Sequence, residues 1–122
     1  MKQYVPLKPV KRGFKVWVVA ESTTGYFLDV QVYVGKEGSG EHGLGERVVL
    51  ELTEQYRGGG YNIFCDNFFS SPRLFQTLHS HSLYACGTVR PNRRDYPVDL
   101  CGTSLQVGEC QFRQSGALTA VV

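Results

Sequence analysis

Asp66 is the residue whose type and position in this sequence could best support chemistry. It follows Tyr61-Asn62-Ile63-Phe64-Cys65, a short and mostly apolar run that predicts a strand buried in the centre of a sheet. Ligands of α/β sheets bind at the carboxyl ends of strands, so a carboxylate there would face a crevice. Carboxylate oxygens suit Mg²⁺, and two-metal phosphoryl-transfer sites need several of them. An exposed turn Asp would give the same local pattern, so a purely structural role is the alternative.

The histidines and cysteines do not form a second candidate set. His79 and His81 lie two positions apart at an expected helix end, so they would point in different directions, and we interpret them and His42 as surface residues. The cysteines lack the CxxC spacing of a zinc site and the density of a disulfide-stabilised secreted domain. We therefore interpret all four as reduced thiols: Cys65, Cys86, Cys101 and Cys110.

Basic residues are concentrated at the N-terminus and in one later loop. Residues 1–15 carry five Lys or Arg and no acid, whereas residues 16–89 carry eight acids and four Lys or Arg. This distribution favours contacts with the phosphate backbone of nucleic acid, although a solvated polar surface would give the same pattern. The candidate DNA-binding residues are Lys8, Lys11, Arg12, Arg90, Arg93 and Arg94.

Composition and hydropathy exclude several classes of protein. The sequence is 42% hydrophobic and 20% charged, which is typical of a globular domain and not of a disordered chain. Its longest apolar stretches are far shorter than the roughly 20 residues that span a bilayer. The N-terminus has no hydrophobic signal segment. We therefore expect an intracellular protein without a membrane span.

The elements before Asp66 are indicated by changes in hydrophobic periodicity. Prolines favour an extended basic arm, and two runs rich in β-branched and aromatic residues favour a β-hairpin. Apolar residues at helical spacing, with Glu46 in the first turn and Arg57 in the last, then favour an amphipathic helix, which Gly58-Gly59-Gly60 should end. The expected elements are the arm at residues 1–13, the hairpin at residues 14–20 and 26–34, and the helix at residues 44–57.

A second helix and three further strands are expected in the second half. Ser71 is the expected N-cap and Pro72 the first helical residue. The buried stripe of this helix should consist of Leu74, Phe75 and Leu78. The strands are expected at residues 83–89, 109–113 and 118–122, with a loop at residues 90–97. Together these elements predict an α/β fold that has a mixed sheet, an N-terminal β-hairpin and two flanking helices.

Both ends of the sequence are abrupt. The last residues, 118–122, are apolar and lack a polar tail, and the basic arm leads directly into the expected hairpin. We expect the chain to be part of something longer.

Four ordered blocks, at residues 2–17, 43–49, 61–71 and 84–93, closely resemble the catalytic domain of piggyBac transposases and the domesticated genes derived from them. The resemblance runs over nearly all 122 residues. It implies a ribonuclease-H-like fold of the DDE type, in which three Asp residues and Mg²⁺ cut and rejoin DNA at TTAA targets in the nucleus.

The resemblance assigns one catalytic role to this chain. The second catalytic Asp of the family lies in a Cys-Asp-Asn-Phe-Phe motif, which stands here as Cys65-Asp66-Asn67-Phe68-Phe69, so Asp66 is the implied catalytic and metal-binding residue. The resemblance places the first family Asp in a strand before the Lys2-Gln3-Tyr4 segment and the third well downstream of residue 122, so we expect neither to have a counterpart here. Asp29, Asp95 and Asp99 fall outside the matching positions.

We therefore expect residues 1–122 to be part of a transposase catalytic domain, with a basic arm at residues 1–13 and a truncated α/β core at residues 14–122. Such a fragment should not bind Mg²⁺ tightly or cleave DNA alone. DNA is the expected partner, and an unpaired sheet edge should favour a dimer or pairing with a full-length relative.

The alternative is a domesticated, non-catalytic DNA-binding or interaction module. Phe68 and Phe69 would then either stack on bases or belong to the core.

Overall fold

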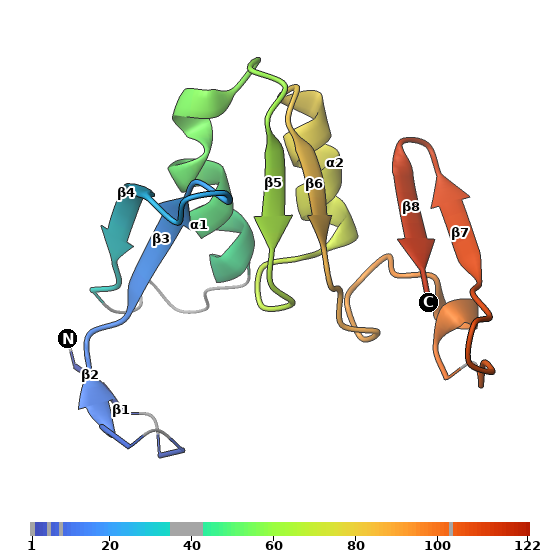
Figure 1. Cartoon of the computed structure of the whole chain (residues 1–122), viewed down its shortest axis with the longest axis horizontal. Helices are drawn as coiled ribbons and strands as arrows, with labels where there is room; N and C mark the ends of the chain where they lie inside the picture. The colour runs from blue at the N-terminus through green and yellow to red at the C-terminus, as the bar shows by residue number, and fades with distance from the viewer. Residues whose placement is uncertain (1, 5, 8, 35–42, 103) are drawn as a thin grey trace. The chain divides into compact units, whose positions relative to one another are not determined.

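The computed structural model describes residues 2–4, 6–7, 9–34, 43–102 and 104–122. The chain divides into two compact units, Met1–Gln55 and Tyr56–Val122, and the described residues of each form one α-helix and two pairs of strands (Figure 1). The α/β class with two helices is thereby confirmed. The expected single mixed sheet is wrong for the described residues, because their strands form four separate two-stranded sheets.

The first unit consists of two antiparallel strand pairs and a helix. The expected hairpin is confirmed, and α1 contacts both of its strands. The elements are β1 (Gln3–Tyr4) paired with β2 (Arg12–Gly13), β3 (Val16–Ala20) paired with β4 (Phe27–Val32), and α1 (Leu44–Leu52). Part of the predicted extended arm is therefore a short strand pair.

The core of the first unit lies on one face of the β3–β4 hairpin. Trp17 is buried on this face, and α1 contributes the buried side chains of Val48, Val49 and Leu52. Because side chains alternate along a strand, the opposite face carries a second apolar set. We call this set the valine face: Val16, Val18, Val30 and Val32, which are between 41% and 52% exposed. The register places Val16 opposite Val32 and Val18 opposite Val30.

The first helix ends earlier than periodicity predicts. Its last residue is Leu52, not Arg57, so the Gly58-Gly59-Gly60 segment does not end it. The buried hydroxyl of Thr53 donates to the carbonyl oxygen of Val49 at 2.7 Å, and the Thr53 N–H bonds to the same oxygen. The chain then continues as a 3-10 turn, η1 (Glu54–Tyr56).

The second unit is a strand–helix–strand arrangement followed by a hairpin. The parallel strands are joined by α2, which packs against β6. The elements are β5 (Asn62–Cys65), α2 (Pro72–Ser80), β6 (Tyr84–Gly87), the short helix η2 (Val98–Leu100), and the antiparallel pair β7 (Phe112–Ser115) and β8 (Leu118–Val121). All the expected strands of this half are confirmed, with shifted ends.

Sequence reasoning predicts α2 well. Ser71 is the N-cap, and its Oγ accepts a hydrogen bond from the N–H of Leu74 at 3.1 Å. Leu74 and Leu78 are fully buried together with Leu83, which directly precedes β6. Phe75 is only half-buried.

The expectation that β5 is buried on both faces is wrong for the described chain. Ile63 and Cys65 are half-buried, but Phe64, which points to the other face, is 67% exposed. Within the described residues β5 pairs with β6 alone. The apolar run therefore predicts the strand correctly but overestimates its burial.

Candidate functional site

Asp66 directly follows β5 and is exposed. Its Oδ1 accepts the N–H of Asn67 at 2.6 Å. Its main-chain carbonyl accepts the N–H groups of Phe69 at 3.0 Å and Ser70 at 3.1 Å. The chain therefore reverses tightly at the carboxyl end of a parallel strand, where the carboxylate is open to solvent. We call residues 66–69 the Asp66 turn.

Ser70 and Gly87 hold this turn against β6. Ser70 is fully buried, and its Oγ donates to the carbonyl oxygens of Asp66 at 3.0 Å and Cys65 at 3.3 Å. A Cβ added at Gly87 would lie 2.2 Å from the Cys65 carbonyl oxygen and 2.7 Å from Ser70 Oγ. Only glycine allows the end of β6 to approach β5 this closely.

Two arginines from the loop after β6 bond to the Asp66 turn. Nε and Nη2 of Arg90 both donate to Oδ1 of Asn67, at 3.2 and 3.1 Å. Nη2 of Arg93 donates to the carbonyl oxygens of Asn67 at 3.1 Å and Phe68 at 2.5 Å. The structure thus brings two of the six candidate DNA-binding residues to the turn that begins at the predicted catalytic Asp.

The three arginines of this loop differ in exposure. Arg90 and Arg94 are exposed, whereas Arg93 is half-buried. Nε of Arg93 is buried and has no hydrogen-bond partner in the described part of the chain. An unpaired buried donor costs about 1–3 kcal/mol, so the two carbonyl bonds of Nη2 must offset that cost. Arg93 therefore faces the protein, whereas Arg94 is exposed and Arg90 is exposed while it bonds to Asn67.

The basic arm belongs to the first unit. Lys11 and Arg12 are exposed, and Arg12 lies in β2. Lys8 lies outside the described residues, as does His42. With Lys2, three described cations of the arm are thus open to solvent, as phosphate contacts require.

The described residues do not assemble a complete metal site. They contain no group of three or more His, Cys, Asp or Glu that could hold a metal ion. The exposed carboxylate of Asp66 fits Mg²⁺ as one oxygen ligand, and the ion would keep most of its waters there. Asp99 is engaged elsewhere, because its Oδ2 lies 2.6 Å from Nε of Arg113.

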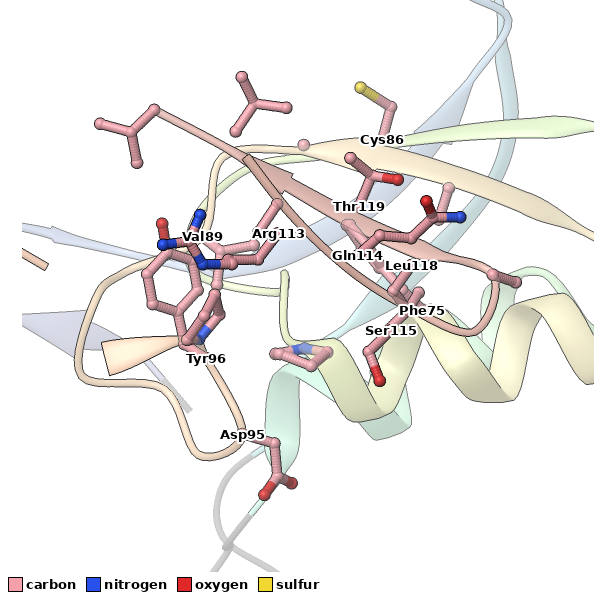
Figure 2. Close-up of a pocket in the computed structure, with 18 of the residues that line it drawn as sticks. Phe75, Cys86, Val89, Asp95, Tyr96, Arg113, Gln114, Ser115, Leu118 and Thr119 are labelled. Carbon is pink, nitrogen blue, oxygen red and sulfur yellow. The ribbon is translucent and has the colours of Figure 1, made fainter. Parts of the chain in front are cut away.

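A cavity lined by described residues of the second unit does not include Asp66. It has a volume of about 790 Å³ and lies between α2 and β6 on one side and the β7–β8 hairpin on the other (Figure 2). Phe75, Val89 and Leu118 contribute apolar side chains to its wall, and Arg113 contributes a charged one. The predicted catalytic carboxylate therefore lies on an open turn and not in this cavity.

The four cysteines differ in their exposure to solvent. The four thiols are free; Cys65 is half-buried and the other three are exposed. Burial raises the pKa of Cys65 to about 11.

The rings of Phe68 and Phe69 are half-buried and meet edge to face with centroids 5.1 Å apart. This packing favours the core interpretation of the two phenylalanines over base stacking.

Sequence reasoning missed three residues that support Asp66, namely Asn67, Ser70 and Gly87. A glycine within a strand pattern signals close backbone approach, so Gly87 could have been found. The roles of Asn67 and Ser70 depend on partners from another segment or on the shape of the turn, and no local pattern indicates them.

Comparisons with known proteins give a consistent result. The family model described as Transposase IS4 matches residues 1–122. The chain is 35% identical over 100 residues to human PiggyBac transposable element-derived protein 3, covering 77% of this chain and 17% of that protein. It is 31% identical over 129 residues to human PiggyBac transposable element-derived protein 5, covering 93% of this chain and 24% of that protein.

The structural comparison covers nearly the whole chain. A chain of the piggyBac transposase synaptic complex with hairpin DNA, solved by cryo-EM, is similar with a TM-score of 0.86 and 35% identity, over 98% of this chain and 26% of that chain. This chain therefore spans about a quarter or less of the proteins it matches. No helix in the described residues is long and apolar enough to cross a membrane.

Proposed function

This chain belongs to the Transposase IS4 family, in its piggyBac branch, and on that premise we propose that it is part of the ribonuclease-H-like catalytic domain of a DDE transposase acting in the nucleus at TTAA targets. In this proposal Asp66 is one of the carboxylates that bind Mg²⁺. The observation that carries the proposal is the exposed carboxylate of Asp66 at the carboxyl end of β5. Bound Mg²⁺ would neutralise charge on the reacting phosphate.

DNA is the proposed partner. The similar structure is described as a synaptic complex with hairpin DNA, and this chain has exposed cations on its arm and beside Asp66. We assign phosphate contacts to the exposed Lys11, Arg12, Arg90 and Arg94, together with Lys8 and Arg93. Arg93 would contribute mainly its charge, since its Nη2 is engaged by two carbonyl oxygens.

The isolated chain should not cleave DNA. Mg²⁺ demands near-ideal octahedral coordination, and a single carboxylate leaves most of its water shell in place. Activity would then require further carboxylates besides Asp66, which the positions of this chain that match the family do not supply. A dimer or a complex with a full-length relative would also cover the strand edges that are unpaired within the described residues.

DNA binding tests the first part of the proposal. The affinity of the purified chain for a TTAA-containing duplex should fall steeply with salt, with a slope of log K against log salt of about −0.9 per phosphate contacted. Replacing Lys11 and Arg12 by Ala should make the slope less steep by about two units. Gly13→Ala is a charge-neutral control in the same strand. A slope near zero for the unaltered chain would reject DNA binding.

Cleavage tests the second part. We expect no cut in the duplex when Mg²⁺ is added to the isolated chain. A cut that Asp66→Asn abolishes would show that the chain is active by itself and would overturn the proposed inactivity.

The alternative is a module that binds DNA or a protein partner without catalysis, as the exposed basic arm would allow. The two proposals differ in their dependence on metal. If Asp66 is a metal ligand, Mg²⁺ should strengthen DNA binding by the unaltered chain more than by Asp66→Asn. A non-catalytic module should show equal responses.

A further inference from the structure

Two consecutive carbonyl groups after Asp66 are held by one guanidinium group. Nη2 of Arg93 lies 3.1 Å from the carbonyl oxygen of Asn67 and 2.5 Å from that of Phe68. The charge on the donor strengthens both hydrogen bonds. Arg93 thereby fixes the orientation of the two peptide groups that directly follow the Asp66–Asn67 bond.

Asn67 connects this guanidinium group to the carboxylate. Its carbonyl accepts from Arg93, its side-chain Oδ1 accepts from Arg90, and its N–H donates to Oδ1 of Asp66 at 2.6 Å. Three polar groups of one residue are thus used at once. The N–H of Asn67 belongs to the Asp66–Asn67 peptide group, which shares the Asn67 Cα with the peptide group that Arg93 holds. A rotation of the held peptide group would therefore move the hydrogen bond that orients the carboxylate.

We propose that Arg93, assisted by Arg90, is a positioning residue that sets the orientation of the Asp66 carboxylate for metal binding. This role rests on the proposed function of Asp66. It differs from a contact with DNA phosphate, because it acts through the hydrogen bonds of Arg93 to the Asp66 turn and needs no nucleic acid. Lysine cannot fully replace arginine here, since its ammonium group lacks the planar fork of donors.

Amide hydrogen exchange tests whether Arg93 holds the turn. The amides of Phe69 and Ser70, which bond to the Asp66 carbonyl, should exchange at least about tenfold faster in Arg93→Ala, and by an intermediate factor in Arg93→Lys. Arg113→Ala is the matched control, because it removes an exposed guanidinium whose partner is Asp99. It should change the exchange of both amides less than about twofold. Unchanged exchange in Arg93→Ala would overturn the proposal.

Mn²⁺ titration tests whether the effect passes through Asp66. Paramagnetic broadening of the Asn67 and Phe68 amides should require at least about fivefold more Mn²⁺ in Arg93→Ala than in the unaltered chain. Asp66→Asn should abolish the broadening, and adding Arg93→Ala to Asp66→Asn should have no further effect, as expected for two coupled residues. If Arg93→Ala speeds exchange but leaves the Mn²⁺ response unchanged, Arg93 is merely structural and the proposal is wrong.

The two measurements separate this inference from the proposed function. If Asp66→Asn leaves the broadening unchanged, Asp66 does not bind metal and the proposed function fails, and with it the positioning role. If amide exchange is unchanged in Arg93→Ala but Asp66→Asn still abolishes the broadening, Asp66 binds metal without help from Arg93. The proposed function then stands and the positioning role is wrong. Should Arg93→Ala not fold, Arg90→Ala, which changes an exposed residue, should raise the exchange rate and weaken the Mn²⁺ response in the same direction by a smaller factor.

Discussion

The carbonyl oxygen of Cys65 lies so close to Gly87 that a Cβ added to the glycine would be 2.2 Å from it. The contact joins the ends of the two parallel strands β5 and β6, one residue before Asp66. The position of the carboxylate therefore depends on the absence of a side chain in the neighbouring strand.

Replacing Gly87 by Ala should destabilise the protein by about 1–3 kcal/mol, because a backbone oxygen cannot move aside as a flexible side chain can. Thermal unfolding followed by circular dichroism measures the change. The matched control is Gly13→Ala in β2, where an added Cβ meets no atom within 4 Å. The control should leave the melting temperature unchanged or slightly raised. Equal melting temperatures for the two variants would contradict the close approach of β5 and β6.

The turn of the β3–β4 hairpin should respond to acid through Glu21. Hydrogen bonds from the Thr24 hydroxyl and from the amides of Thr23 and Thr24 lower the pKa of Glu21 from 4.5 to about 2. Because the folded pKa lies below the ordinary value, the stabilisation is fully present above about pH 4.5 and is lost as the pH falls toward 2. An NMR titration of the Glu21 carboxyl group should show the low pKa directly.

The variant Thr24→Val tests the cause of this shift. It removes the hydroxyl donor but keeps the shape of the side chain and the backbone N–H, so the pKa of Glu21 should rise part of the way toward 4.5. A Thr24→Val protein in which Glu21 titrates as in the unaltered chain would show that the hydroxyl is not the main cause.

Cys65 should be the least reactive of the four cysteines in the folded protein. Burial raises its pKa to about 11, so only about one molecule in a thousand carries the reactive thiolate at pH 8. Alkylation with iodoacetamide, followed by mass spectrometry, should modify Cys86, Cys101 and Cys110 first, since these are exposed. In denaturant all four should react at similar rates. Labelling of Cys65 as fast as Cys86 in the native protein would contradict its burial.

The sequence allows the local elements to be predicted better than their assembly. Ser71 and Pro72 mark the start of α2 because capping depends only on neighbouring residues. The burial of β5 could not be predicted in the same way, since the apolar character of Phe64 does not show whether another element covers it. Periodicity likewise missed the end of α1, where the Thr53 hydroxyl bonds back to the Val49 carbonyl.

The candidate site shows the same division between local and distant information. Asp66 is predictable as a strand-end carboxylate, and the family resemblance of the motif around it is the source of the role proposed for it. The clustering of basic residues in one loop makes Arg90 and Arg93 candidates for DNA contact. The sequence does not show that both bond to Asn67, which lies more than 20 residues earlier. Such contacts depend on how β5 and β6 bring their following loops together.

The valine face should make the isolated chain associate at high concentration. Its four valines lie on one side of the β3–β4 hairpin and are 41–52% exposed, so two copies could bury this apolar surface against each other. Sedimentation velocity should show a sedimentation coefficient that rises with protein concentration. Changing Val18 and Val30 to Thr should weaken the association and leave the melting temperature almost unchanged, because threonine also suits an exposed strand. The control Val107→Thr, at a fully exposed site outside the strands, should leave the association unaltered. A chain that sediments as a monomer at every concentration would show that the exposed valines alone do not drive self-association.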